Sequence, residues 1–273
     1  MASWTQAAGA TLKAGGHALE YRCWGPTPEQ APTLVLLHEG LGSVALWRDL
    51  PQKLVDATGF GVLAYSRAGY GQSELATLPR PLDYMTQEAH VLGSVMDAVG
   101  VSQAVLLGHS DGATIAAIYG GSVSDMRVRG LILMAPHFFA ETSGIDAIRV
   151  VGDTYRTGDL RERLAPYHAD VDVTFNGWHD VWTDPGFIAN WNVADNIDHW
   201  RIPVLAIQGL GDEYGTTAQI SEIEDRIYSP LEIVLLEGCG HSPHLDQPAQ
   251  TLEAITAFTA RLDRLEREEA RFG

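Results

Sequence analysis

Short apolar runs alternate along the chain with longer segments in which apolar residues recur at helical spacing. This order predicts an α/β fold, in which parallel strands are joined by helices that cover both faces of the sheet. We predict core strands at 34–37, 61–65, 104–107, 131–134, 204–207 and 233–236, all apolar on both faces. We predict helices near 44–57, 84–99, 111–120, 216–228 and 248–268.

Two stretches depart from this alternation. Residues 11–25 have the pattern of an antiparallel hairpin that turns at Gly15 and Gly16, which brings the expected sheet to eight strands. Residues 140–200 contain no buried-strand run, and a structureless loop of that length is improbable in a compact domain. Because parts of this stretch have helical spacing, we predict a helical cap at 140–200, inserted into a core formed by 1–139 and 201–273.

The strand at 104–107 runs into the sequence Gly108-His109-Ser110-Asp111-Gly112, and a helical pattern starts directly after it. A GxSxG sequence alone is a weak signal, since glycine and serine also form ordinary turns. In a sharp strand-to-helix turn, however, the glycines leave room for the serine hydroxyl to stand clear of the sheet. Ser110 is therefore our candidate nucleophile.

A serine hydroxyl needs a base in order to attack at neutral pH, and the base needs a carboxylate to orient it. Asp212 follows the strand at 204–207, and His241 follows the strand at 233–236. Both therefore lie at the carboxyl edge of the sheet, where open parallel sheets bind their ligands. His244, three residues further on, is the competing candidate for the base.

With the order Ser, Asp, His and these flanking strands, nearly the whole chain resembles the α/β-hydrolase superfamily, in particular serine hydrolases with a helical cap. The resemblance implies a mostly parallel eight-stranded sheet with helices on both faces. It implies Ser110 as nucleophile, His241 as general base and then acid, and Asp212 as the orienting carboxylate. It also implies an oxyanion hole built from the backbone N–H groups of Gly40 and Asp111.

Two carboxylates distinguish this chain from the usual family pattern. Glu39 stands between His38 and Gly40 where the family usually shows HG, and Asp111 follows the nucleophile. One interpretation is that they disfavour anionic substrates or bind a cationic or hydroxylated group. The other is that each is paired locally, because buried charges normally have partners. Arg67, in a loop that resembles the family's DxRGxGxS, is the expected partner of Glu39.

Trp178 and Trp182 are four residues apart within the predicted cap and would share one helix face. They are candidates for lining an apolar pocket under the cap, although packing of the cap on the sheet would use the same side chains.

The net charge of −17 disfavours nucleic acid and anionic membranes as partners. The spacing of Cys23 and Cys239 suits no metal site, and two lone cysteines suggest a reducing compartment. The start of the chain lacks a signal-peptide pattern, so we predict a cytoplasmic protein. We expect no cofactor and no metal, and the sequence leaves homo-oligomerisation open.

These observations predict a carboxylic ester hydrolase that cleaves an ester, thioester or lactone of a small, largely apolar substrate through an acyl-enzyme. The same fold does not fix one reaction. A carbon–carbon bond hydrolase of ring-cleavage products uses the same triad, and a slow-turnover ligand-binding receptor would retain it. Both alternatives stay open at this stage.

Overall fold

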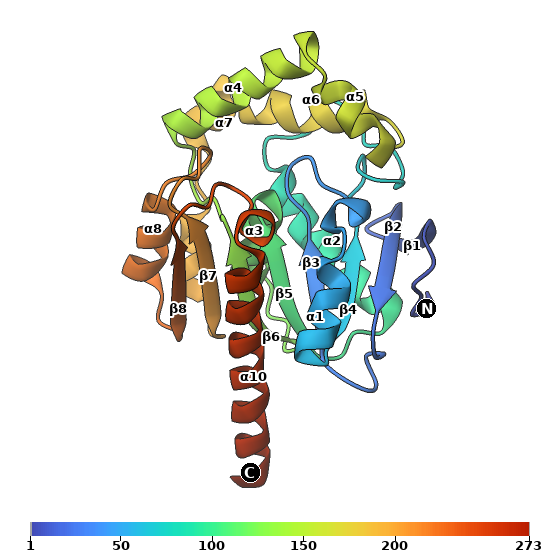
Figure 1. Ribbon diagram of the computed structural model, residues 1–273, viewed down its shortest axis with the longest axis vertical. Helices are drawn as coiled ribbons and strands as arrows, with labels where there is room; N and C mark the ends of the chain where they lie inside the picture. Colours follow the sequence, from blue (N-terminus) through green and yellow to red (C-terminus); the bar gives the residue numbers. More distant parts are fainter. Residues whose placement is uncertain (1, 273) are drawn as a thin grey trace.

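The computed structural model describes residues 2–272, with side chains through residue 265 and at 268. An eight-stranded sheet runs through the middle of the molecule (Figure 1). Its strands are β1 (Ala10–Ala14), β2 (His17–Trp24), β3 (Thr33–Leu37), β4 (Gly61–Tyr65), β5 (Ala104–His109), β6 (Val128–Met134), β7 (Val204–Gly209) and β8 (Leu231–Leu236). The spatial order is β1-β2-β4-β3-β5-β6-β7-β8. The β1–β2 and β2–β4 pairs are antiparallel and the others are parallel, which confirms the predicted mostly parallel sheet.

Helices cover both faces of this sheet. The α-helices are α1 (Leu50–Thr58), α2 (Tyr84–Val99), α3 (Asp111–Ser122), α4 (Thr142–Thr157), α5 (Leu160–Leu164), α6 (Val171–Trp182), α7 (Pro185–Asn190), α8 (Ala218–Arg226), α9 (Pro243–Asp246) and α10 (Pro248–Phe272). The described residues also form the short 3₁₀ helices η1 (Val44–Trp47), η2 (Ala165–Tyr167) and η3 (Ala194–His199).

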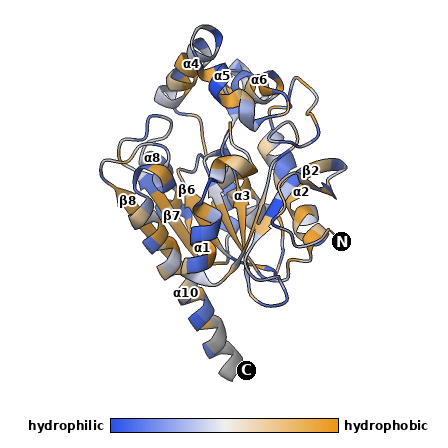
Figure 2. Ribbon diagram, turned by 45° about the vertical axis from the view of Figure 1, so that its right-hand side comes forward, coloured by the Kyte–Doolittle hydropathy of each residue, from blue (hydrophilic) through white to orange (hydrophobic). Residues whose placement is uncertain are grey.

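Alternate residues of each central strand face two different apolar cores. In β3, Val35 and Leu37 pack in the core that includes α2 and α3, whereas Leu34 and Leu36 pack in the core that includes α1 and α10. Figure 2 shows these strands as the most consistently hydrophobic part of the molecule. Burial on both faces explains why the strands have continuous apolar runs instead of alternating ones.

The structure corrects two of the predicted elements. The helix predicted at 44–57 is two helices, η1 and α1, separated by Arg48 with a φ of 53°. Pro51 lies in the first turn of α1, a position that proline favours because its missing N–H is not needed there. β8 is an edge strand, only partly buried, and Leu235 is 47% exposed. The prediction that all core strands are covered on both faces is therefore wrong for β8.

Between β6 and β7 the chain leaves the sheet and forms α4 to α7, which lie above the body of the molecule (Figure 1). The stretch at 140–200 is therefore largely helical and not a structureless loop. The chain then returns through η3, which packs against α3 in the body. There the indole N–H of Trp200 donates to the carbonyl of Ala117 at 2.9 Å, so this tryptophan is a core residue.

Within residues 2–272, no helix is both long enough and apolar enough to cross a lipid bilayer.

Candidate active site

The chain turns from β5 into α3 at a single residue, Ser110. Its φ of 54° and ψ of −121° are strained for an L-residue. Two glycines make the turn sterically feasible. A Cβ on Gly108 would overlap the backbone of Gly112, and a Cβ on Gly112 would overlap the carbonyl of Leu37 at the end of β3. Close backbone packing thus explains both glycines of the GxSxG sequence.

We predict that Gly112→Ala lowers the free energy of unfolding by about 2–4 kcal/mol, because neither colliding backbone can move without disturbing the sheet. The matched control is Gly93→Ala in α2, where an added Cβ meets the Tyr119 hydroxyl at 3.1 Å, the end of a side chain that can adjust. Urea unfolding of both variants checks the prediction. Equal stability of the two variants would show that the close approach at Gly112 is not a constraint.

The carboxyl ends of β7 and β8 bring Asp212 and His241 into contact. His241 Nδ1 lies 2.8 Å from Asp212 Oδ2 and 2.9 Å from Oδ1. Asp212 also accepts from the backbone N–H of Tyr214 and from the side-chain amide of Gln208, both at 2.8 Å. Burial raises the pKa of Asp212, but the contacts with His241 and the backbone outweigh this and lower it overall. Asp212 is thus a buried carboxylate that fixes the His241 ring.

His244, the competing candidate, makes no such contact. Its ring packs against Trp47, with centroids 5.4 Å apart, and against His109 at 5.0 Å. Burial lowers the pKa of His244 to about 3, so it is a neutral residue in its packed position. The structure pairs Asp212 with His241 and not with His244.

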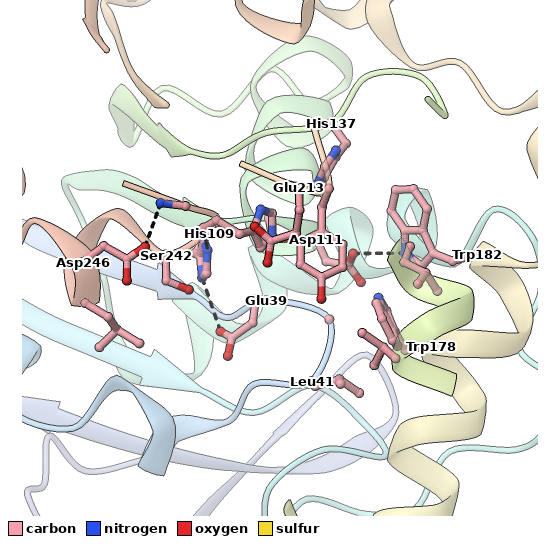
Figure 3. A pocket seen from close by; sticks show the side chains of 18 residues that line it. Glu39, Leu41, His109, Asp111, His137, Trp178, Trp182, Glu213, Ser242 and Asp246 are labelled. Carbon is pink, nitrogen blue, oxygen red and sulfur yellow. Dashed lines mark hydrogen bonds and ion pairs between the residues drawn. The ribbon is translucent and has the colours of Figure 1, made fainter. Parts of the chain in front are cut away.

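Ser110 and His241 line the same pocket, which has a volume of about 420 Å³. Its walls come from the loops after β3, β5, β6, β7 and β8 and from helices α4 and α6 (Figure 3). Four acidic residues line it, Glu39, Asp111, Glu213 and Asp246, whereas no lysine or arginine of the described chain does. The pocket is therefore electrostatically unfavourable for anions.

Gly40 and Asp111 both line this pocket, and within residues 2–272 the backbone N–H of neither donates a hydrogen bond. The Ser110 hydroxyl makes no hydrogen bond to His241 in the same part of the chain. Such contacts are often longer in ligand-free enzymes than in the reacting complex. Trp178 covers Gly40 so closely that a Cβ on this glycine would overlap the indole ring.

The side chain of Asp111 is buried and fully paired. The Tyr84 hydroxyl and the Trp182 indole N–H donate to it, the latter at 3.2 Å, and Arg67 lies 3.8 Å away. Burial raises the pKa of Asp111, and Arg67 only partly offsets the effect. The interpretation of Asp111 as a locally paired carboxylate fits this network, which also ties α6 to the body of the molecule through Trp182 (Figure 3).

The expected pairing of Glu39 with Arg67 is wrong. Arg67 donates to the backbone carbonyls of His38 and Glu39, at 2.6 and 3.1 Å, and its charge faces Asp111. The Glu39 carboxylate instead lies 3.6 Å from His109 Nδ1. Burial raises the pKa of Glu39, but the contact with His109 outweighs it and the pKa falls overall. Arg67 thus contacts the backbone of the loop that carries Glu39 and not the Glu39 carboxylate.

His137, which is not among the predicted site residues, follows β6 and lines the pocket. The residue is buried, and its ring has no hydrogen-bond partner in the described chain and packs against Trp182 and His241. Burial lowers its pKa to about 3, so the ring is neutral. The signal was available, because His137 stands at the same sheet edge as Ser110.

Trp178 and Trp182 both lie on α6 and line the pocket. Among the described residues, no group of three or more His, Cys, Asp or Glu side chains is arranged to hold a metal ion.

Comparison with known proteins identifies the family of this chain. The profile of the alpha/beta hydrolase family matches residues 34–254. The chain is similar to a proline iminopeptidase of Lactobacillus delbrueckii, at 31% identity over 89% of this chain and 94% of that one. It is also similar to a pimeloyl-acyl carrier protein methyl ester esterase of Aeromonas hydrophila, at 26% identity over 84% and 96% of the two chains.

Among solved structures, the fold is similar to that of an enol-lactonase from Burkholderia xenovorans, with a TM-score of 0.70 and 20% identity. The match covers 92% of this chain and all of the other. These relatives act on different bonds, so the comparisons leave the substrate unresolved. The extent of the family match and the architecture agree. This chain belongs to the alpha/beta hydrolase family and is a hydrolase of that fold.

Proposed function

We propose that this protein is a serine hydrolase that cleaves an ester, thioester or lactone of a small, largely apolar substrate through an acyl-enzyme. The observation that carries the proposal is the pair formed by Asp212 and His241, 2.8 Å apart, at the wall of the pocket that Ser110 also lines. A buried carboxylate on Nδ1 fixes the tautomer that leaves Nε2 free to accept a proton.

In the proposed mechanism, Ser110 Oγ attacks the substrate carbonyl carbon while His241 Nε2 takes the hydroxyl proton. The carbonyl oxygen becomes an anion, which the N–H groups of Gly40 and Asp111 stabilise. The bond to the leaving oxygen or sulfur then breaks, and His241 returns its proton to that atom. Water, activated by the same histidine, hydrolyses the acyl-enzyme and regenerates the Ser110 hydroxyl.

The inserted helical region supplies the apolar wall, and we propose that α4 to α7, within the predicted cap at 140–200, form the lid of the pocket. Ile148 and Val151 of α4 and Trp178 and Trp182 of α6 line the pocket opposite the sheet. A volume of about 420 Å³ suits a small acyl group. The acidic lining supports neutral or cationic substrates over anionic ones.

The test is an assay of nitrophenyl esters in two series, one of increasing acyl length and one with neutral, cationic and anionic acyl groups of equal size. We expect kcat/KM to peak at short apolar acyl groups and to be at least about tenfold lower for the anionic member. Ser110→Ala is the control in every assay.

Two results would redirect the proposal. A preference for long or anionic acyl groups would contradict the substrate class. Negligible turnover of every ester, together with a Ser110 that reacts with a fluorophosphonate, would favour a carbon–carbon bond hydrolase or a slow-turnover receptor.

A further inference from the structure

The ring of His109 stands between two oxygen acceptors from different loops. Its Nε2 lies 2.7 Å from the backbone carbonyl oxygen of His241, and its Nδ1 lies 3.6 Å from Glu39 Oε2. A neutral imidazole carries one N–H, so one of its nitrogens would turn a lone pair toward an oxygen. Both contacts are favourable only for the doubly protonated ring. At 3.6 Å the contact between Nδ1 and Glu39 is too long for a hydrogen bond, and it is an ion pair only when the ring is charged. The geometry therefore favours a charged His109 beside Glu39.

The surrounding groups are compatible with this charge. Burial lowers the pKa of His109, but Glu39, the His241 carbonyl and the more distant Asp212 raise it overall. The other histidines that face it are His244, with ring centroids 5.0 Å apart, and His241 at 5.2 Å. His244 is neutral, so it adds no opposing charge at neutral pH.

Glu39 is turned toward its own loop. A Cβ on Gly42 would overlap the Glu39 carboxylate, which shows that this group folds back against its own turn. The Glu39 carbonyl is also fixed, because His38 Nδ1 lies 2.7 Å from it and Arg67 donates to it at 3.1 Å. Figure 3 shows the carboxylate directed at the ring of His109. Glu39 is thus held in place to meet His109.

The strand order makes this contact structurally important. β6 and β7 lie between β5 and β8, so no sheet hydrogen bond joins the loop that carries Ser110 to the loop that carries His241. His109 immediately precedes Ser110, and its N–H to the His241 carbonyl spans this gap directly. Through Glu39, the link extends to the loop of Gly40.

We propose that Glu39 and His109 are positioning residues that hold the loops of Gly40, Ser110 and His241 together. The Glu39 carboxylate contacts the His109 imidazolium, which in turn donates to the His241 carbonyl. The proposal rests on the proposed function, since it assigns Ser110 and His241 to one reaction. It gives Glu39 a role in holding the site and not in contacting the substrate.

The first test is independent of activity. The protonation of His109 is measured by ¹⁵N NMR in the wild type, in Glu39→Gln and in Glu213→Gln, which removes a pocket carboxylate that makes no ion pair with His109. We expect the pKa of His109 to lie above the ordinary histidine value in the wild type and in Glu213→Gln, and to fall in Glu39→Gln. A wild-type pKa that is not raised, or one that Glu39→Gln leaves unchanged, would overturn the proposal.

The second test is a double-mutant cycle on the best ester substrate. His109→Leu removes the N–H donor, whereas His109→Gln keeps a donor near the position of Nε2 without needing a charge. We expect Glu39→Gln and His109→Leu each to lower kcat by about tenfold with KM nearly constant, and His109→Gln to recover most of the loss. In the His109→Gln background, Glu39→Gln has little further effect.

Two outcomes would contradict the positioning role. One is an equal cost of Glu39→Gln in both backgrounds. The other is a change in KM confined to cationic substrates, which would place Glu39 on the substrate. If Ser110 instead proves not to be the nucleophile, the proposed function fails, while the NMR test still decides whether Glu39 and His109 form the pair.

Discussion

Ser110→Ala will reduce kcat by at least about 10⁴-fold while leaving the fold intact. The loss follows from removing the only atom that forms the covalent intermediate. The fold should be insensitive, because within residues 2–272 the Ser110 hydroxyl makes no hydrogen bond that alanine would abolish. Both residues carry a Cβ, so alanine adds no steric strain at the φ of 54°. Steady-state kinetics and urea unfolding measure the two effects together.

An Ala variant that keeps more than about one hundredth of the wild-type rate would contradict the assignment of Ser110. A large loss of stability would leave the kinetic result without meaning as a test of mechanism. Gly93→Ala, which lies outside the pocket, is the control for activity or stability that is lost during preparation of a variant.

Asp212→Asn is expected to lower kcat by about 10³–10⁴-fold. An amide that turns its NH2 group toward His241 Nδ1 favours the tautomer in which Nδ1 carries no proton, so the histidine would be held in the wrong tautomer. The matched control is Glu213→Gln, which removes the neighbouring carboxylate without touching the bond between Asp212 and His241. We expect the control to retain at least about one tenth of the wild-type kcat.

Asp212 also accepts bonds from the backbone of Tyr214 and Gly215, at 2.8 and 3.3 Å, so Asp212→Asn is expected to cost about 1–3 kcal/mol of stability. Rates should be measured at temperatures below the one at which the variant unfolds. A variant whose kcat stays within tenfold of the wild type would remove Asp212 from the mechanism.

The fold was largely predictable because its determinants are local. Continuous apolar runs predict strands that are covered on both faces, and the interruption at 140–200 predicts the insertion of the helical region. β8 was misjudged because an apolar sequence does not reveal whether a strand has a neighbour on both sides. Pro51, in the first turn of α1, is a local signal for the break between η1 and α1, but helical spacing alone does not show this break.

The sequence predicted those contacts of the site that depend only on which loops carry the residues. Asp212 and His241 follow successive strands that pair side by side, so their meeting follows from topology. The partner of Glu39 depends on the directions of side chains from three loops, which sequence spacing does not encode. For this reason the sequence predicted Arg67 as the partner of Glu39, although the partner is His109, the residue next to Ser110.

His137 illustrates the same limit. Its place after β6 could have been read from the chain, but the depth of its burial and its position against Trp182 emerge only from the packing of α6. A neutral, unpaired imidazole in the pocket wall is suited to a hydrogen bond with a polar group of the substrate.

The most direct test of the central claim is covalent labelling. The wild-type protein and Ser110→Ala are treated with a fluorophosphonate, and the adduct is located by peptide mass spectrometry. A nucleophile activated as proposed gives one adduct per chain, on Ser110, and Ser110→Ala gives none. An unlabelled wild type, or an adduct on another residue that persists in Ser110→Ala, would contradict the account.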